Sequence, residues 1–327
     1  MKVAKLTIVE ALNLALREEM ERDEHVVILG EDVGRDGGVF RVTDGLYEKF
    51  GENRVIDTPL AESGIVGTAI GMAVYGLKPI AEIQFMGFMP LGYHQIILHA
   101  ARIRNRSRGR FTVPLVVRMP YCGGIKALEH HSESIESLFV HIPGLKTVIP
   151  ASPYDAKGLL LSSIRDPDPV IFLEPKRIYR AIREEVPEGD YTVPLGKAKI
   201  VQEGDDITLI AWGAMVRTCQ RAAELAKEKN ISAEIIDLRT VQPIDAEVII
   251  KSVEKTGKVL VVHEAPKTLG VGAEIVALIN EKALLSLEAP VERVTGFDIT
   301  VPLPKTEHWY IPSEKRVLRG IQKVVSF

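Results

Sequence analysis

The sequence predicts an α/β protein of two domains, each built on a mostly parallel sheet that helices cover on both faces. Short, continuous apolar runs alternate with helical patterns along the chain, and this alternation is typical of parallel sheets. A turn-rich stretch over residues 187–199 interrupts the alternation and is expected to be a linker. The chain has 327 residues, of which 46% are hydrophobic, which is enough for two cores.

The first domain is expected over residues 1–186. The capping box Thr7-Ile8-Val9-Glu10 predicts a first helix that extends to about Asp23. The continuous apolar run 26–29 ends at Gly30, which is typical of a buried parallel strand. Further strands are expected near residues 55–57, 79–85, 115–119, 147–149 and 170–173, and further helices near 44–50, 63–75, 90–106, 134–139 and 154–164.

The second domain is expected over residues 200–327 and repeats the alternation. Domains of roughly 190 and 130 residues both fall within the normal size range. The expected strands lie near residues 207–212, 233–238, 259–263 and 291–294, and the expected helices near 216–229, 245–256, 273–280 and 314–324.

Charge and composition exclude several classes of function. A net charge of −3 provides no basic field that would attract nucleic acid. Cys122 and Cys219 are far apart and form no C-x-x-C pair, so we expect neither a disulfide scaffold nor a zinc site, and a reducing cytoplasm is the default location. The N-terminal sequence lacks the apolar core of a signal peptide, and no stretch of about 20 apolar residues would span a membrane.

Glu62 stands before a helical segment with few polar side chains. Glycine recurs through residues 64–76, although each glycine in a helix costs about 1 kcal/mol relative to alanine. Such a sequence usually allows another backbone or a ligand to approach closely. Glu62 would then lie at the edge of a dry interface, where the pKa of a carboxyl group rises and its proton can be donated. The alternative is that Glu62 only complements the helix dipole.

Two further segments follow expected strands. In open α/β sheets, ligands bind beyond the carboxyl ends of the strands. Phe85 and Phe88 would stack on a planar ring, although they are also consistent with ordinary core aromatics. His131, in the segment Glu129-His130-His131-Ser132-Glu133-Ser134, would move protons near neutral pH, or would be an ordinary solvated histidine. Adjacent histidines without metal-ligand spacing do not favour a metal site, and His263 is expected to be structural.

Phosphate-binding motifs are absent from the sequence. It contains no G-x-x-x-x-G-K-[ST], no G-x-G-x-x-G after a strand and no G-x-S-x-G. An α/β protein with a candidate acid, stacking aromatics and a histidine, but no phosphate cradle, resembles half of a cofactor site.

Five motifs in register identify a family. The chain resembles the beta subunit of the thiamine-diphosphate-dependent decarboxylase of 2-oxo acid dehydrogenase complexes, and the resemblance extends to Phe327. The matching motifs are Gly30-Glu31-Asp32-Val33-Gly34, Asp57-Thr58-Pro59-Leu60-Ala61-Glu62-Ser63-Gly64, residues 82–88, His131-Ser132-Glu133-Ser134 and Asp237-Leu238-Arg239-Thr240-Val241-Gln242-Pro243.

The resemblance implies a pyrimidine-binding domain like that of transketolase, followed by a transketolase C-terminal domain. Family members are tetramers of two alpha and two beta subunits, with thiamine diphosphate between an alpha and a beta chain. The alpha chain holds the diphosphate and magnesium through a Gly-Asp-Gly…Asn-Asn motif, which this chain lacks.

The resemblance also assigns roles to particular residues. Glu62 would face N1′ of the aminopyrimidine, and its proton would favour the imino tautomer that deprotonates the thiazolium carbon. Phe88, with Phe85 beside it, would pack on the pyrimidine, and Leu60 would offer a backbone contact. His131 would orient the substrate carboxylate or donate a proton during acyl transfer to lipoamide.

A structural potassium site is a further implication of the resemblance. Its ligands would be backbone oxygens of a strand-end segment, although a prolyl turn without an ion is the alternative. Asp168 replaces the usual Asn of the family at one of the positions that supply them. The positions are Leu115, Ser163, Ile164, Asp166 and Asp168.

Substrate and assembly remain open at this stage. His263-Glu264-Ala265-Pro266 resembles the branched-chain enzymes, whereas residues 190–243 equally resemble the pyruvate enzymes; we expect branched-chain or broad 2-oxo acid use. Acetoin dehydrogenase beta chains share the motifs, and a self-sufficient transketolase-like enzyme would need a diphosphate motif.

The chain end would dock the dihydrolipoyl acyltransferase core, with Glu288 and Phe327 as candidate contacts. The glycine-rich helix predicts an obligate oligomer.

Overall fold

The computed structural model describes residues 3–327, which form two compact units. The first unit contains residues 3–121 and 138–195, and the second contains residues 122–137 and 196–327. Residues 1–2 of the predicted first domain lie outside the described residues. The second unit resumes at residue 196, inside the expected linker, but no pattern in the sequence indicated that residues 122–137 would join it.

A parallel sheet forms the centre of the first unit. Its strands follow the order β6-β7-β5-β4-β2-β3, and every neighbouring pair is parallel. A separate antiparallel pair, β1 with β8, was not predicted. The strands are β1 (Val3–Leu6), β2 (Val26–Gly30), β3 (Val55–Asp57), β4 (Lys78–Glu82), β5 (Val116–Tyr121), β6 (Lys146–Val148), β7 (Val170–Pro175) and β8 (Glu184–Pro187).

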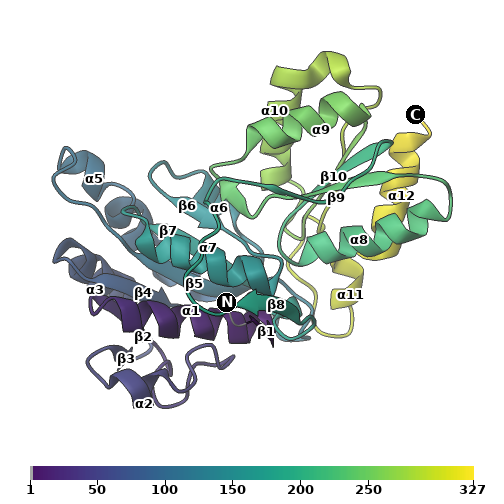
Figure 1. Cartoon of the computed structure of the whole chain (residues 1–327). Helices are drawn as coiled ribbons and strands as arrows, with labels where there is room; N and C mark the ends of the chain where they lie inside the picture. Colours follow the sequence, from purple (N-terminus) through teal and green to yellow (C-terminus); the bar gives the residue numbers. More distant parts are fainter. Residues whose placement is uncertain (1–2) are drawn as a thin grey trace. The chain divides into compact units, whose positions relative to one another are not determined.

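Two long helices lie side by side against this sheet (Figure 1). Helix α1 (Ile8–Arg22) begins with the predicted capping box, in which Thr7 accepts from the N–H of Glu10 and the Glu10 side chain accepts from the N–H of Thr7. Helix α7 (Pro153–Arg165) is its neighbour. Besides the short helices α4 and α5, whose bounds are given below, the first unit contains α2 (Leu46–Phe50), α3 (Glu62–Val74) and α6 (Ser137–Val140), the last of which begins in the second unit's segment.

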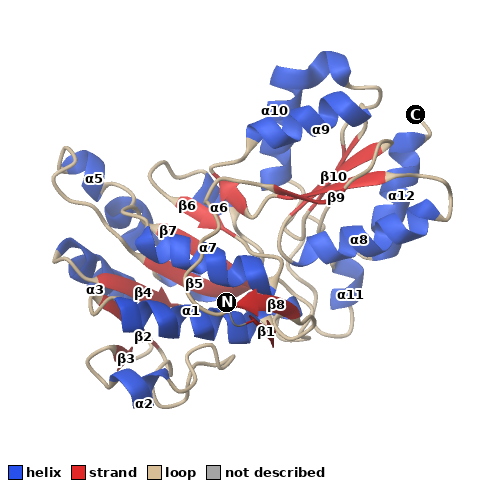
Figure 2. Cartoon of the chain, in the orientation of Figure 1, coloured by secondary structure: helices blue, strands red, loops and turns tan. Residues whose placement is uncertain are grey.

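The second unit contains a sheet with the order β14-β13-β10-β11-β9, in which only β9 is antiparallel to its neighbour. Helices α8 and α12 pack together, as do α9 and α10, and helices flank the strands (Figure 2). The strands are β9 (Lys199–Gln202), β10 (Ile207–Ala211), β11 (Ala233–Asp237), β12 (Thr240–Gln242), β13 (Val259–Val262) and β14 (Glu292–Val294), and the helices are α8 (Ala214–Lys227), α9 (Ala246–Thr256), α10 (Val271–Ala283), α11 (Glu307–Tyr310) and α12 (Glu314–Val325).

The predicted helix over residues 90–106 is wrong as a single helix. Pro90 has no N–H to donate, and it lies inside the 3₁₀ turn η1 (Met86–Leu91) instead of opening a long helix. The chain then forms the short helix α4 (Tyr93–Gln95), the π-helical turn η2 (Ile96–Ala100) and α5 (Ile103–Arg106). Strand β4 also ends at Glu82, earlier than predicted, so Phe85 precedes η1 in a turn.

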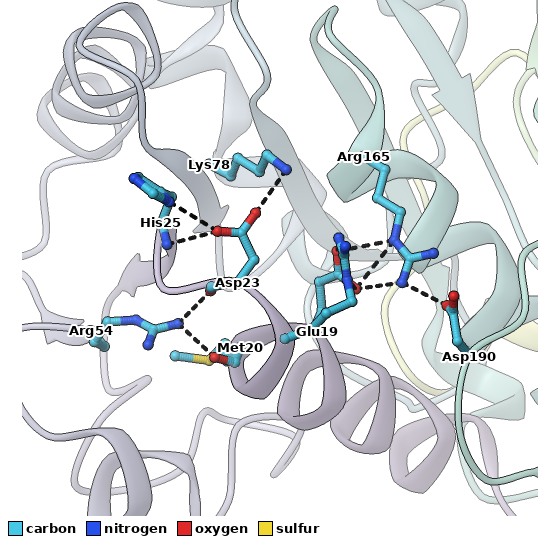
Figure 3. A network of polar contacts seen from close by, with 9 residues as sticks. Glu19, Met20, Asp23, His25, Arg54, Lys78, Arg165 and Asp190 are labelled. Atoms are coloured by element: carbon cyan, nitrogen blue, oxygen red, sulfur yellow. Dashed lines mark hydrogen bonds and ion pairs between the residues drawn. The ribbon is translucent and has the colours of Figure 1, made fainter.

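Ion pairs fix the C-terminal end of α1 (Figure 3). Glu19 is almost fully buried, and its carboxylate pairs with Arg165 of α7 at 2.6 Å. Arg165 also pairs with the exposed Asp190 at 2.7 Å. Asp23 accepts from Lys78 Nζ at 2.8 Å, and this hydrogen bond holds the pKa of Asp23 well below its usual range. The side chain of Arg54 donates to the Met20 and Asp23 carbonyl oxygens at 3.0 Å each.

Candidate active site

Three parallel strands end at the same level in the first unit. Gly30 at the end of β2 pairs with Asp57 on β3 and with Glu82 on β4. The segments that follow these strands therefore leave the sheet at one edge, where ligands bind in open α/β folds. The Glu31 turn, the Glu62 turn and the Phe85–Phe88 segment all begin at this edge. The sequence predicted a position after a strand for Phe85 and Phe88, whereas no such position was predicted for the other two turns.

Asp57 joins two of these segments. Its carboxylate accepts the N–H of Gly34 at 2.6 Å and that of Arg35 at 3.2 Å. A Cβ atom at Gly34 would lie 2.7 Å from Asp57 Oδ2, so only glycine allows this approach. The predictions did not include Asp57 as a functional residue, and its contribution is to fix the backbone that leads to Glu62.

Glu62 is the first residue of α3 and is 4% exposed. Within residues 3–327, its carboxyl group makes no hydrogen bond or ion pair, which is unusual for a buried carboxyl. Burial, followed by the negative charges of Glu62 and Asp32, raises the pKa of the nearby Glu31. Leu60, two residues before Glu62, is 76% exposed.

Two phenylalanine rings lie after β4. Phe85 is buried, whereas Phe88 is half-buried, and their ring centroids are 5.6 Å apart in an edge-to-face arrangement. Phe40 contacts the other side of Phe85 at 5.5 Å. Phe85 is therefore a supporting core aromatic, and Phe88 is the ring that retains exposed surface for stacking on a ligand.

A buried ionic cluster lies under this edge and was not predicted. Arg118 on β5 forms two hydrogen bonds with the carboxylate of Glu174 on β7, at 2.7 and 2.8 Å, and it also pairs with Glu82. The Tyr179 hydroxyl donates to Glu174. Burial raises the pKa of Glu82 and raises that of Tyr179 well above its usual value. Charged residues within otherwise apolar strands were the signal in the sequence that could have identified this cluster.

His131 lies in the second unit, at the end of the 3₁₀ turn η3 (Glu129–His131). It is partly exposed, and its ring centroid is 4.3 Å from that of His130. His130 in turn lies 3.5 Å from the Glu129 carboxylate. Glu62 and His131 belong to different units.

The five residues predicted to hold potassium lie around the end of α7 and the starts of β5 and β7. Lys146 pairs with the Asp166 carboxylate at 2.6 Å, and Arg104 pairs with that of Asp168 at 2.5 Å. The Leu115 carbonyl accepts the N–H of Val170. Among the described residues, no group of three His, Cys, Asp or Glu side chains could hold a metal ion, so a cation here would depend on main-chain oxygens. The potassium site stays a prediction.

The residues at the first unit's edge fit a planar heteroaromatic ring. A buried carboxyl group without a protein partner would bind a ring nitrogen, and a half-buried phenyl ring would cover the ring face. This fit rests on the Glu62 carboxyl group, for which no hydrogen bond or ion pair is found within residues 3–327.

Models of two protein domains match the chain. The transketolase pyrimidine-binding domain matches residues 4–182, and the transketolase C-terminal domain matches residues 196–317. The protein is therefore of the transketolase-like class, in which the first unit is the pyrimidine-binding domain.

Close relatives narrow this class. A protein named pyruvate dehydrogenase E1 component subunit beta from Acholeplasma laidlawii is 58% identical over 322 residues, which are 98% of both chains. The Bacillus subtilis protein of the same name is 50% identical over 99% of this chain and 100% of its own. The chain belongs to the family of beta subunits of the thiamine-diphosphate-dependent 2-oxo acid dehydrogenases.

Solved structures support the fold. A split-gene transketolase, described as an inactive beta4 tetramer, has a TM-score of 0.81 at 21% identity, with 99% of both chains covered. A Pichia stipitis transketolase has a TM-score of 0.71 at 14% identity, and the match covers 46% of that chain. Within residues 3–327, no helix is both long enough and apolar enough to cross a membrane.

Proposed function

We propose that this chain is the beta half of an enzyme that oxidatively decarboxylates pyruvate and transfers the acyl group to lipoamide on a dihydrolipoyl acyltransferase. The single observation that carries the proposal is Glu62, a buried carboxyl group without a partner in the described chain, at the helix start that the family motif assigns to the cofactor. Pyruvate is favoured over the expected branched-chain substrates because relatives at 58% and 50% identity carry the name pyruvate dehydrogenase.

The proposal assigns a role to each site residue. Thiamine diphosphate, when bound, supplies the thiazolium ring that accepts electrons from the substrate carbon. Glu62 holds a proton at its carboxyl group, directed to a ring nitrogen of the pyrimidine. Phe88, supported by Phe85, packs on the ring face, and the Leu60 main chain offers a polar contact. His131 orients the substrate carboxylate or donates a proton during acyl transfer.

The cofactor site would be shared with an alpha subunit. This chain has no Gly-Asp-Gly…Asn-Asn motif, so magnesium and the diphosphate would be held by the partner. We therefore propose a heterotetramer of two alpha and two beta chains. The contacts of Glu288 and Phe327 with an acyltransferase, and a cytoplasmic location, stay predictions.

Calorimetric titration of thiamine diphosphate with magnesium tests the shared site. We expect no binding to this chain alone and tight binding once the alpha partner is added. Tight binding by this chain alone would contradict the proposal and would favour a self-sufficient transketolase-like enzyme.

The variant Glu62→Gln tests the role of the carboxyl proton. We expect kcat of the assembled enzyme to fall about 100-fold or more, because proton transfer by a positioned side chain contributes at least that much. The exposed Glu52→Gln is the matched control and should leave kcat unchanged. Full activity of Glu62→Gln would remove Glu62 from the mechanism.

Comparison of pyruvate with 3-methyl-2-oxobutanoate tests the substrate. We expect a higher kcat/KM for pyruvate. A higher kcat/KM for the branched substrate would show that the enzyme is a branched-chain 2-oxo acid dehydrogenase. Turnover of acetoin instead of either 2-oxo acid would identify an acetoin dehydrogenase subunit.

A further inference from the structure

The segment that carries His131 is a closed loop of the second unit. The N–H of Cys122 donates to the carbonyl oxygen of Glu133 at 3.1 Å, and this bond joins the two ends of the loop. Between these ends the only regular element is the short turn η3, so local backbone structure does little to fix the position of His131.

Two carboxylates from elsewhere in the second unit hold the first arm of this loop. Glu307 at the start of α11 accepts the N–H of Gly124 at 2.8 Å and that of Lys126 at 3.2 Å. Glu264, which follows β13, accepts the N–H of Gly123. Both glutamates are buried, being 3% and 4% exposed. Hydrogen bonds to an ionised acceptor are about twice as strong as neutral ones.

The first arm is shaped to meet these carboxylates. A Cβ atom at Gly123 would lie 2.9 Å from Glu307 Oε1 and 3.2 Å from Glu264 Oε1. Cys122 and Lys126 both have left-handed backbone conformations, with φ of 69° and 58°. Non-glycine residues keep this conformation only when their surroundings enforce it. The Glu307 carboxylate holds the N–H of Lys126, and the Glu133 carbonyl oxygen holds that of Cys122.

The chain just after the loop has its own support. Trp212 Nε1 donates to Glu136 Oε1 at 3.2 Å, and the indole stacks on the buried His263 ring at 5.2 Å with an interplanar angle of 14°. Burial lowers the pKa of His263 to about 3, so the ring is neutral at physiological pH. His263 and Glu264 are thus adjacent residues: Glu264 supports the first arm of the loop, and His263, through Trp212, supports Glu136 just after the loop.

We infer that Glu307 and Glu264 are positioning residues that hold the His131 loop in the conformation required for acyl transfer. The inference rests on the proposed function, which gives His131 its role. Neither glutamate needs to touch the substrate, because both act through the loop backbone. A displacement of about 1 Å at a reacting group can lower a rate about 100-fold.

The test uses the enzyme assembled with its alpha partner and compares Glu307→Ala, Glu307→Gln and His131→Ala. Transfer of the acyl group to a lipoyl domain is measured beside decarboxylation with an artificial electron acceptor. We expect Glu307→Ala to slow acyl transfer about 10- to 100-fold. Glu307→Gln should slow it less, because its amide oxygen still accepts one N–H. The exposed Glu281→Ala on α10 is the matched control and should have no effect.

Combination with His131→Ala separates positioning from a general structural role. If Glu307 acts through His131, adding Glu307→Ala to His131→Ala should change the rate less than about twofold. Equal fold-losses in both backgrounds would overturn the inference. If His131→Ala alone leaves acyl transfer unchanged, the proposed role of His131 fails, and this result is distinct from a failure of Glu307.

Hydrogen exchange gives a readout that does not depend on activity. The amides of Gly124 and Lys126 should exchange about tenfold faster in Glu307→Ala, while cofactor affinity of the assembled enzyme stays within about twofold of the wild type. Unchanged exchange at these two amides would also overturn the inference. Glu307→Gln provides the same comparison if the alanine variant fails to assemble.

Discussion

At the scale of single residues, the buried acid Glu136 makes the stability of the second unit depend on pH. Burial raises its pKa from the ordinary value of 4.5 to about 7, the hydrogen bond from Trp212 opposes the rise, and the charge of Glu264 adds to it. Between pH 4.5 and about pH 7, the folded chain binds more protons than the unfolded chain. The free energy of unfolding therefore falls as pH rises through this window, by up to about 3 kcal/mol.

The variant Glu136→Gln should remove this contribution. Between pH 4.5 and pH 7.5, the free energy of unfolding of the wild type should fall by about 3 kcal/mol more than that of the variant. Denaturant unfolding at several pH values measures it. The same pH dependence in both proteins would show that Glu136 titrates normally.

Gly34 provides a second prediction for a single residue. In Gly34→Ala the new Cβ atom would meet Asp57 Oδ2 at 2.7 Å, so the turn that leads to Glu62 must shift. We expect a loss of about 1–3 kcal/mol in the free energy of unfolding, together with weaker cofactor binding by the assembled enzyme. Thermal unfolding and calorimetric titration measure the two effects. Wild-type values in both would mean that the turn adapts without loss.

At the scale of elements, Arg165 couples α1 to α7 through one buried and one exposed carboxylate. Arg165→Met leaves the buried Glu19 with only Arg22 as its partner, and it should lower the free energy of unfolding by about 2 kcal/mol. Asp190→Asn removes the exposed partner of the same arginine and should change the free energy of unfolding by less than about 1 kcal/mol. Similar losses from both substitutions, measured by denaturant unfolding, would contradict the role given to burial.

At the scale of the whole molecule, α3 presents glycines that this chain does not require. A Cβ atom at the exposed Gly71 would have no neighbour within 4 Å. Alanine there should stabilise the helix by about 1 kcal/mol. If α3 packs against another subunit, as its glycine-rich sequence predicts, the same methyl group should weaken association.

Gly71→Ala should therefore raise the melting temperature of the chain alone and weaken its assembly with the alpha partner, as measured by sedimentation. Asn280→Ala, on an exposed turn of α10, is a control that should stabilise a helix without affecting assembly. Unimpaired assembly of Gly71→Ala would place the subunit interface elsewhere.

Local sequence patterns were sufficient to predict many of the helices and strands. Strand β3 has the predicted bounds, and the capping box at Thr7 opens α1 as expected, because both depend on residues close in sequence. Prediction failed over residues 90–106, where Pro90 and the neighbouring glycines interrupt the helix. It also missed the antiparallel β1–β8 pair, because the pairing joins segments that are far apart in the chain.

The sequence alone determined the alternation of strands and helices, the place of Glu62 at the start of a helix, and the motifs that identify the family. Only the tertiary structure decided which groups each buried carboxylate contacts. Glu264 and Glu307 meet the loop amides across 141 and 183 residues of chain. Periodicity and capping report on neighbours within a few residues, whereas these contacts exist only because packing brings distant segments together.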